Sequence, residues 1–256
     1  MNMNIGAQYY TVRDSIKTIK DFNETCRKIS DIGYKLIQIS ASPLPAKEMR
    51  EITDSYGLKV ALTHRSFPDF EKDIDEVIEY NKTLGSDICG LGMMPLSYGE
   101  NAQTLSDFIN KANTICEKLR RENMYFGYHN HSFEFAKIDG KLIMDYLIDE
   151  TDPEIFNFIA DTYWIQLGGK DPADYISDLG KRAIAVHFKD YKIQQKSWTT
   201  PSMAEVGLGN LDWDAITDAC CASGCRFAFV EQDICERDPF ESLAISYNYL
   251  KGKGFC

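Results

Sequence analysis

The sequence lacks the signals of several common protein classes. No apolar run approaches the ~20 residues that a membrane-spanning helix needs. The first segment, MNMNIGAQYYTVRD, has no basic stretch followed by an apolar one, as a signal peptide would have. No Gly-x-Gly-x-x-Gly follows the first strand-like run, and no Gly-x-x-x-x-Gly-Lys-Ser/Thr occurs at all. We therefore expect a cytoplasmic protein with no membrane partner, and nucleotide-binding folds are disfavoured.

Basic residues and paired cysteines are also scarce. The chain has 28 basic and 39 acidic residues, a net charge of −11, and this balance disfavours a nucleic-acid partner. Its eight cysteines form no Cys-x-x-Cys pair, so they indicate packed, reduced thiols rather than a structural zinc site. With 256 residues and 44% hydrophobic composition, the chain can bury a large core.

Strand-like and helix-like segments alternate along the whole chain. Helical spacing ends at glycine in three cases, at Gly33, Gly85 and Gly224. Eight units of this kind in ~250 residues predict a (β/α)8 barrel, an α/β fold, formed by residues 1–256 as a single domain. A doubly wound open sheet is the main alternative. The eight strand-like runs are 5–12, 34–40, 59–64, 87–92, 124–131, 156–161, 183–190 and 227–233, and the helical segments are 13–33, 69–85, 104–123, 141–150, 172–180, 212–224 and 239–254.

The chain has only four histidines, and all of them fall where a predicted strand ends. They are His64, His129, His131 and His187. Asp161, Lys189, Glu231 and Asp233 also end strand-like runs, and active sites of (β/α)8 barrels lie at the carboxyl ends of the strands. Such a ring of nitrogen and oxygen ligands suits one divalent ion, Mn²⁺, Mg²⁺, Co²⁺ or Zn²⁺. The longest irregular segment, 191–211, is expected to be a loop over the barrel mouth.

Each of these residues also has an ordinary structural interpretation. A single histidine at a strand end more often donates a structural hydrogen bond than binds a metal. Asp161 can cap a following helical turn, and Glu231 can pair with a surface lysine. The shared position of all four histidines is what these interpretations leave unexplained.

Several motifs together resemble the xylose isomerase-like TIM barrel family of sugar and sugar-phosphate isomerases and epimerases. They are DTYWIQLGGKDPADYI (161–176), AVHFKD (185–190), VGLGNLDWDAI (206–216) and VEQD (230–233), with GAQYYTVRD and YHNHSFEF supporting them. The resemblance spans essentially the whole chain. It implies a carbohydrate substrate, a homo-oligomer as the common assembly, and one divalent metal held by Glu, Asp, His and Glu from late strands.

Three of these four ligands carry over to the chain as Asp161, His187 and Glu231. The first glutamate does not, because many members have Glu-Asn-His where this chain has His129-Asn130-His131. The resemblance therefore implies His129 as the fourth ligand. An alignment shifted by one residue puts Tyr128 there instead, and Glu134 is the nearest replacement carboxylate. A further alternative has three protein ligands plus water, with His129 only positioning the substrate. Losing one carboxylate favours Mn²⁺, Co²⁺ or Zn²⁺ over harder ions.

In the epimerases of this family, two metal-bound glutamates exchange a proton with the carbon beside a carbonyl, through an enediolate. Of these two bases the chain retains Glu231, so the second catalytic role falls to His129 or His131. The resemblance also suggests that His64, His131, Trp164 and Lys189 bind substrate. Alternatives are a rim hydrogen bond or salt bridge for His64 and Lys189, and core packing for Trp164.

The function expected from the resemblance is a metal-dependent isomerase or epimerase of a sugar, keto-sugar or sugar phosphate. The missing glutamate also favours a lyase or dehydratase acting on a keto-sugar or keto-inositol, because elimination needs one base and one acid. A non-catalytic sugar-binding protein is a third alternative. A DNA-repair endonuclease shares the fold, but it needs more metal-binding histidines and a basic surface.

Overall fold

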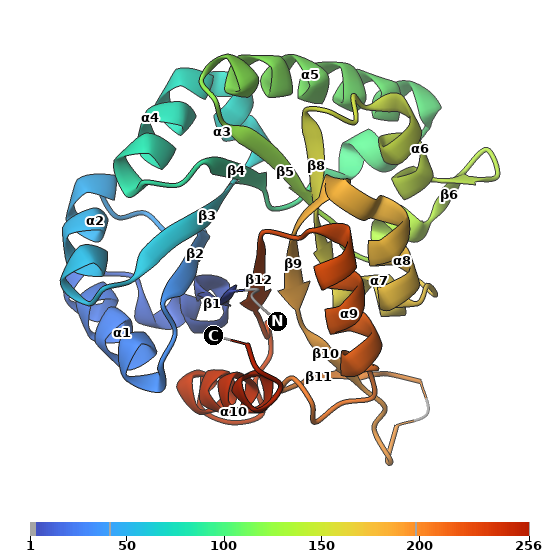
Figure 1. Ribbon diagram of the computed structural model, residues 1–256. Coiled ribbons are helices and arrows are strands. Elements are labelled where there is room, and N and C mark those ends of the chain that lie inside the picture. Colours follow the sequence, from blue (N-terminus) through green and yellow to red (C-terminus); the bar gives the residue numbers. More distant parts are fainter. Residues whose placement is uncertain (1–3, 41, 198, 256) are drawn as a thin grey trace.

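The computed structural model describes residues 4–40, 42–197 and 199–255 and shows a closed, parallel eight-stranded barrel surrounded by helices (Figure 1). Going round the barrel, the strand order is β1, β12, β9, β8, β5, β4, β3, β2. The predicted (β/α)8 fold is therefore confirmed. The barrel strands are β1 (Asn4–Gln8), β2 (Leu36–Ser40), β3 (Lys59–Arg65), β4 (Ile88–Leu91), β5 (Tyr125–His129), β8 (Phe156–Asp161), β9 (Ala183–Phe188) and β12 (Phe227–Val230).

The helices lie outside the barrel, between consecutive strands (Figure 1). Gly33, Gly85 and Gly224 directly follow the helices that end at Ile32, Leu84 and Ser223 and cap their carboxyl ends, as the sequence predicted. The helices are α1 (Ile19–Ile32), α2 (Ala46–Ser55), α3 (Phe67–Lys72), α4 (Ile74–Leu84), α5 (Ala102–Arg121), α6 (Ile143–Glu150), α7 (Thr162–Leu167), α8 (Pro172–Leu179), α9 (Trp213–Ser223) and α10 (Pro239–Gly252). No helix among the described residues has the length and apolar character needed to cross a membrane.

Several predicted boundaries were wrong. The run 5–12 is a strand only to Gln8, because Tyr9–Ser15 forms a 3-10 helix that buries Tyr9 and Val12. The helical segment 69–85 is broken at Asp73, whose side chain caps the start of α4. No helix was predicted from the sequence at Ala46–Ser55, where α2 lies.

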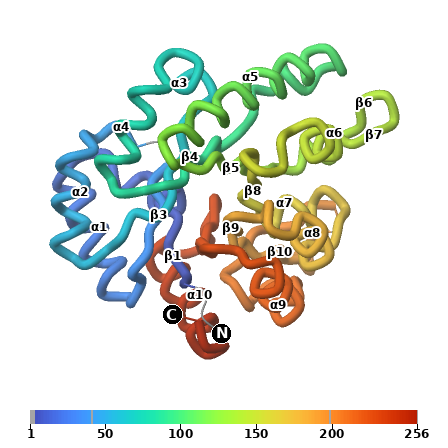
Figure 2. Tube along the Cα trace, turned by 45° about the horizontal axis from the view of Figure 1, so that its top comes forward, coloured from blue at the N-terminus to red at the C-terminus, as the bar shows by residue number. Residues whose placement is uncertain are grey.

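The segment 191–211 is not wholly irregular, contrary to expectation. It contains most of an antiparallel hairpin formed by β10 (Asp190–Lys192) and β11 (Ser202–Ala204). A second hairpin, β6 (Lys137–Ile138) with β7 (Lys141–Leu142), projects from the ring of helices near α6 (Figure 2). Both hairpins lie outside the barrel sheet.

Alternation along the strands places the polar residues inside the barrel. Successive side chains of a strand point to opposite faces, so Ile159 and Asp161, or Phe229 and Glu231, face the same side. The barrel interior is filled below by apolar side chains, including Leu62, Ile159 and Phe229. Glycine is needed at Gly6, where a Cβ atom would lie 2.7 Å from the ring of Phe229. The polar residues that face the interior follow these apolar residues along each strand, at the carboxyl ends of the strands.

Candidate metal centre

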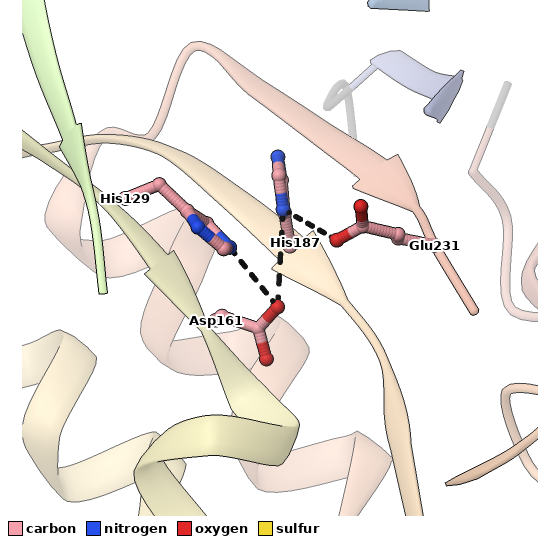
Figure 3. A group of neighbouring side chains, drawn as sticks. All are labelled: His129, Asp161, His187 and Glu231. Carbon is pink, nitrogen blue, oxygen red and sulfur yellow. Dashed lines mark hydrogen bonds and ion pairs between the residues drawn. The ribbon is translucent and has the colours of Figure 1, made fainter. Parts of the chain in front are cut away.

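Four buried side chains from four barrel strands meet at the carboxyl end of the barrel. They are His129, Asp161, His187 and Glu231, and one ligand atom from each lies within 4.8 Å of the other three (Figure 3). Asp161 and His187 are fully buried, and the other two are 4% exposed. All four residues expected from the sequence as metal ligands are therefore together.

Asp161 ends β8 and lies between the two histidines. Its Oδ2 atom is 3.2 Å from His129 Nε2 and 3.8 Å from His187 Nδ1. Its Oδ1 atom accepts from the backbone N–H of Trp164 at 3.0 Å, which caps α7. The capping role considered from the sequence is real, and it uses the oxygen that does not face the histidines.

His129 is oriented by a backbone carbonyl. Its Nδ1 atom lies 3.0 Å from Gly92 O, and because a carbonyl can only accept, Nδ1 carries the hydrogen. The lone pair of a neutral His129 is then on Nε2, which faces Asp161. This is the arrangement that fixes the tautomer of metal-binding histidines. Burial opposes protonation of His129, but the neighbouring Asp161 outweighs it and raises the pKa of His129 above its ordinary value.

His187 is oriented in the same way by a side chain from β2. Its Nε2 atom donates to Gln38 Oε1 at 2.8 Å, which leaves the lone pair on Nδ1. That Nδ1 atom lies 2.9 Å from Glu231 Oε2 without a hydrogen bond of acceptable geometry, and Oε2 forms an ion pair with Lys189 Nζ at 2.9 Å. A buried nitrogen without a partner is uncommon in folded proteins, and a cation bound by Nδ1 and Oε2 would satisfy it.

The charges of the centre also fit a divalent cation. Lys189, 1% exposed, places its Nζ atom 3.0 Å from Asp161, 2.9 Å from Glu231 and 3.1 Å from Asp233. Three carboxylates and one ammonium give a net charge of −2 when the histidines are neutral. Burial opposes ionisation of Glu231, but Lys189 and His187 hold the pKa of Glu231 well below its usual range. Burial alone would lower the pKa of Lys189, but the three carboxylates outweigh burial and raise the pKa above its ordinary value, so the ammonium is retained.

The structure shows where each candidate for the missing glutamate lies. Tyr128 points away from the cluster, packing against Phe156 and donating its hydroxyl to Glu134 Oε1 at 2.7 Å. Glu134 also accepts from the His131 backbone N–H at 2.8 Å, so this carboxylate is committed to the turn after β5. Burial raises the pKa of Glu134 to about 7. Of the three candidates, His129 is the one whose side chain lies in the cluster.

A cavity of about 650 Å³ opens above the centre. This volume lies in the range of small-molecule sites, ~300–1,000 Å³. Of the residues predicted to bind substrate, His64, His131 and Lys189 line it, whereas Trp164 does not. Trp164 lies behind the lining, with its ring 5.4 Å from the His131 ring and 5.2 Å from Lys189 Nζ.

The two histidines that are not in the cluster offer unpaired nitrogens. His64 Nε2 and His131 Nδ1 are buried without a hydrogen-bond partner. Burial lowers the pKa of His131 to about 3, and burial with the nearby His129 and His187 lowers that of His64. Both rings are therefore neutral at physiological pH and can donate or accept one hydrogen bond from a ligand.

Two residues that position the cluster were missed in the sequence. Gln38 holds His187, and Asn130 accepts from the Asp161 backbone N–H through its Oδ1 atom at 3.0 Å. Gln38 had one visible signal, because it interrupts the apolar run LIQIS at a position that faces the barrel interior. The partner of Gln38 is 149 residues away along the chain, which no local pattern indicates.

Fold and site together define a (β/α)8 barrel with a candidate divalent-metal centre at the carboxyl end of its strands. Residues 26–230 match the profile of the xylose isomerase-like TIM barrel family, and the chain belongs to that family. No curated protein matches the sequence.

Solved structures with similar folds cover nearly the whole chain. A sugar phosphate isomerase/epimerase from Parabacteroides distasonis is 22% identical, with a TM-score of 0.80 over 97% of this chain and 98% of that one. The probable 3-DHS dehydratase of petrobactin synthesis from Bacillus anthracis is 15% identical, with a TM-score of 0.74 over 97% and 99%. An L-ribulose 3-epimerase is 14% identical, with a TM-score of 0.74 over 98% and 94%. At these identities the likeness shows the shared fold.

Proposed function

We propose that the chain is a metal-dependent isomerase or epimerase of a carbohydrate. The observation that carries the proposal is the buried cluster of His129, Asp161, His187 and Glu231 beneath a cavity of monosaccharide size. Family membership supports it, because the family includes sugar isomerases and epimerases. The net charge of −11 does not favour a nucleic-acid substrate.

The four cluster residues would hold one divalent ion. Two imidazoles and two carboxylates suit Mn²⁺, Co²⁺ or Zn²⁺ better than ions that demand oxygen ligands alone, such as Mg²⁺. The bound ion supplies a Lewis acid that polarises the substrate carbonyl.

Glu231 is the proposed proton acceptor. It is the one cluster carboxylate that lines the cavity, and its Oε2 atom lacks a hydrogen bond. Its depressed pKa means that it is ionised at neutral pH and can accept a proton from the carbon beside the carbonyl. Lys189 also lines the cavity, and its Nζ atom lies 2.9 Å from Glu231 Oε2. From this position Lys189 would donate a hydrogen bond to a substrate oxygen.

Return of the proton needs a second group. His129 can serve only if one nitrogen is free, and its Nδ1 is bonded to Gly92 O while its Nε2 faces the cluster. We therefore assign His129 to the metal. His131 has an unpaired Nδ1, but burial lowers its pKa to about 3, so it holds no proton to return at neutral pH. The second proton-transfer role therefore goes to the Lys189 ammonium, which also lines the cavity. His64 offers a hydrogen bond to the substrate from across the barrel.

One observation favours a second candidate, a dehydratase. Where epimerases of the family have a second glutamate, this chain has a histidine whose two nitrogens are both engaged. One carboxylate base, Glu231, and one nearby acid, Lys189, are sufficient for elimination of water. A dehydratase also shares the fold.

Two measurements test the proposal. Elemental analysis of protein purified without chelator, then reloaded with metal, should find one divalent ion per chain. The loaded protein is next incubated in D2O with a panel of free and phosphorylated ketoses and aldoses. Deuterium appearing beside a carbonyl, without other mass change, supports the isomerase or epimerase, whereas loss of water supports the dehydratase.

Glu231→Gln is the matched variant, because it retains size and removes the base. Exchange should fall by at least ~10²-fold, the usual contribution of a general base. An intact metal-loaded wild type that binds sugars and exchanges none of them would indicate a sugar-binding protein instead.

A further inference from the structure

The cavity wall opposite the metal centre is formed mainly by uncharged hydrogen-bonding groups. Gln8 and Ser40, which end β1 and β2, pair with each other at 2.9 Å. The hydroxyl of Ser42 donates to the sulfur of Met49, a weak acceptor, at 3.4 Å and accepts from the backbone N–H of Leu44 at 3.4 Å. Amide and hydroxyl groups of this kind match the alternating donors and acceptors of a polyol.

Two cations line the cavity among the described residues, and both are already neutralised. Lys189 contacts three carboxylates within 3.1 Å. Arg65 lies 2.9 Å from Glu76 and 3.6 Å from Asp69, and its guanidinium packs on the ring of Tyr80. Counting the five carboxylates that contact these two cations (Asp69, Glu76, Asp161, Glu231 and Asp233) against the two cations and one bound divalent ion leaves a net charge of −1. A phosphate dianion would be repelled rather than held there.

The glycine-containing segment VGLGN, residues 206–210, offers no phosphate cradle. Asp190 already fills the role of an anion, accepting from the backbone N–H groups of Gly207 at 2.9 Å and Gly209 at 3.0 Å. The other three N–H groups donate to Ser246 Oγ, Glu205 O and Tyr191 O. Every backbone donor of the segment is satisfied inside the protein, so none remains for a substrate phosphate.

We infer that the substrate is an uncharged polyhydroxylated carbonyl compound, and that the site discriminates against its phosphate ester. This inference rests on the proposed function and specifies its substrate class. The substrate carbonyl would lie at the metal centre, and its hydroxyls would reach Gln8 and Ser42. A terminal phosphate would have to leave water for a wall of negative net charge, where no lining lysine or arginine of the described residues is free to offset the desolvation.

The test uses matched pairs, each a free ketopentose or ketohexose and the same sugar phosphorylated at its last carbon. Binding to the Zn²⁺-loaded full-length chain is measured by saturation-transfer NMR, and proton exchange is measured separately in D2O. We expect at least one free sugar to bind ten times more tightly than its phosphate. Equal or tighter binding of the phosphate, or no binding of any free sugar, overturns the inference.

The two readouts separate this inference from the proposed function. Exchange that occurs only with phosphorylated sugars supports the function and overturns the inference. Binding of free sugars without exchange in any of them supports the inference and contradicts the function.

Glu76→Gln sharpens the test, because Glu76 is exposed and lies outside the cavity lining. The substitution removes one of the two carboxylates that neutralise Arg65. Affinity for the phosphorylated sugar should rise about threefold or more, while that for the free sugar stays unchanged. Glu79→Gln, on the same exposed helix α4, is the control and should change neither. If Glu76→Gln leaves the ratio unchanged, charge neutralisation of Arg65 is not the basis of selectivity.

Discussion

Lys189 and Asp190 are neighbours in the chain but belong to two different buried charge clusters. Lys189 points into the barrel, where it contacts Asp161, Glu231 and Asp233. Asp190 points the other way and forms no ion pair with any residue that the structure describes. Its carboxylate accepts from four backbone N–H groups and from Trp213 Nε1. Alternation of side chains along the strand separates them. The charges around Lys189 leave room for a ligand to bind, whereas the hydrogen bonds of Asp190 are all made within the protein.

The comparison shows that burial of a charged residue does not by itself mark a functional site. Asp190 is as buried as Asp161. They differ in what remains unsatisfied around them. Near Asp161, His187 Nδ1 and Glu231 Oε2 lack hydrogen bonds, whereas every donor that faces Asp190 is paired with it. Unsatisfied partners, rather than burial alone, indicate where a ligand binds.

The largest effect is expected from Asp161→Asn. The amide retains the cap on α7 through its oxygen but removes a ligand charge shared by both histidines. Divalent-metal affinity should fall on the order of a thousandfold, about 4 kcal/mol. Isothermal titration with Mn²⁺ and Zn²⁺ measures it. Unchanged affinity would exclude Asp161 from the metal centre.

Asp190→Asn makes the same chemical change in the other cluster, and the opposite result is expected. One carboxylate oxygen becomes an NH2 group facing N–H donors, so buried donors lose their acceptor. The free energy of unfolding should fall by about 3 kcal/mol, measured by urea denaturation of the metal-free protein. Metal affinity of the folded variant should stay within about twofold. A metal defect matching that of Asp161→Asn would show that the clusters are not independent.

A third buried carboxylate, Glu134, sharpens the comparison because its contacts are Tyr128 OH and a backbone N–H, without a cation. Burial raises its pKa from 4.5 to about 7. The folded protein then binds this proton more tightly than the unfolded chain. The contribution of Glu134 to the free energy of unfolding is therefore greatest below pH ~4.5 and declines as pH rises to ~7.

Glu134→Gln removes that titration. Relative to the variant, the wild type should lose roughly 3 kcal/mol of unfolding free energy between pH 4.5 and pH 8. Urea denaturation of both metal-free proteins at several pH values measures the difference. Glu48→Gln, at an exposed position of α2, is the control and should give no such slope. A flat difference for Glu134→Gln would mean that Glu134 ionises normally in the fold.

The sequence predicted most of the barrel because its strands and helix ends carry local signals. The run 156–161 coincides with β8, and glycine marks the ends of α1, α4 and α9. The run 5–12 failed because apolar residues alone do not separate a strand from a short 3-10 helix. The hairpin of β10 and β11 was not predicted, because it pairs two short segments that lie ten residues apart in the chain, Lys192 opposite Ser202.

The candidate ligands were predictable for a related reason: each follows an apolar run and falls at the same end of the barrel. Their orientation was not. Whether His129 or Tyr128 faces the centre depends on a one-residue register. Gln38 on β2 and Gly92, directly after β4, bond to the histidines from elsewhere in the barrel. Neutralisation of Arg65 and Lys189 is likewise visible only in space.

Gln38 gives the smallest expected effect, since it touches the metal centre through one hydrogen bond to His187. Gln38→Leu removes the acceptor that sets the tautomer of His187, so Nε2–H is left unpaired and the lone pair is no longer held on Nδ1. Metal affinity should fall about tenfold to a hundredfold, as for other residues that orient a ligand.

Gln8→Leu is the matched control for this substitution. Gln8 lies on the neighbouring strand β1 and bonds Ser40 rather than a candidate ligand. Metal titration should therefore be unchanged in Gln8→Leu, while sugar binding weakens, because Gln8 lines the cavity. Equal metal affinities in the two variants would mean that the His187–Gln38 hydrogen bond does not tune the metal affinity of the centre.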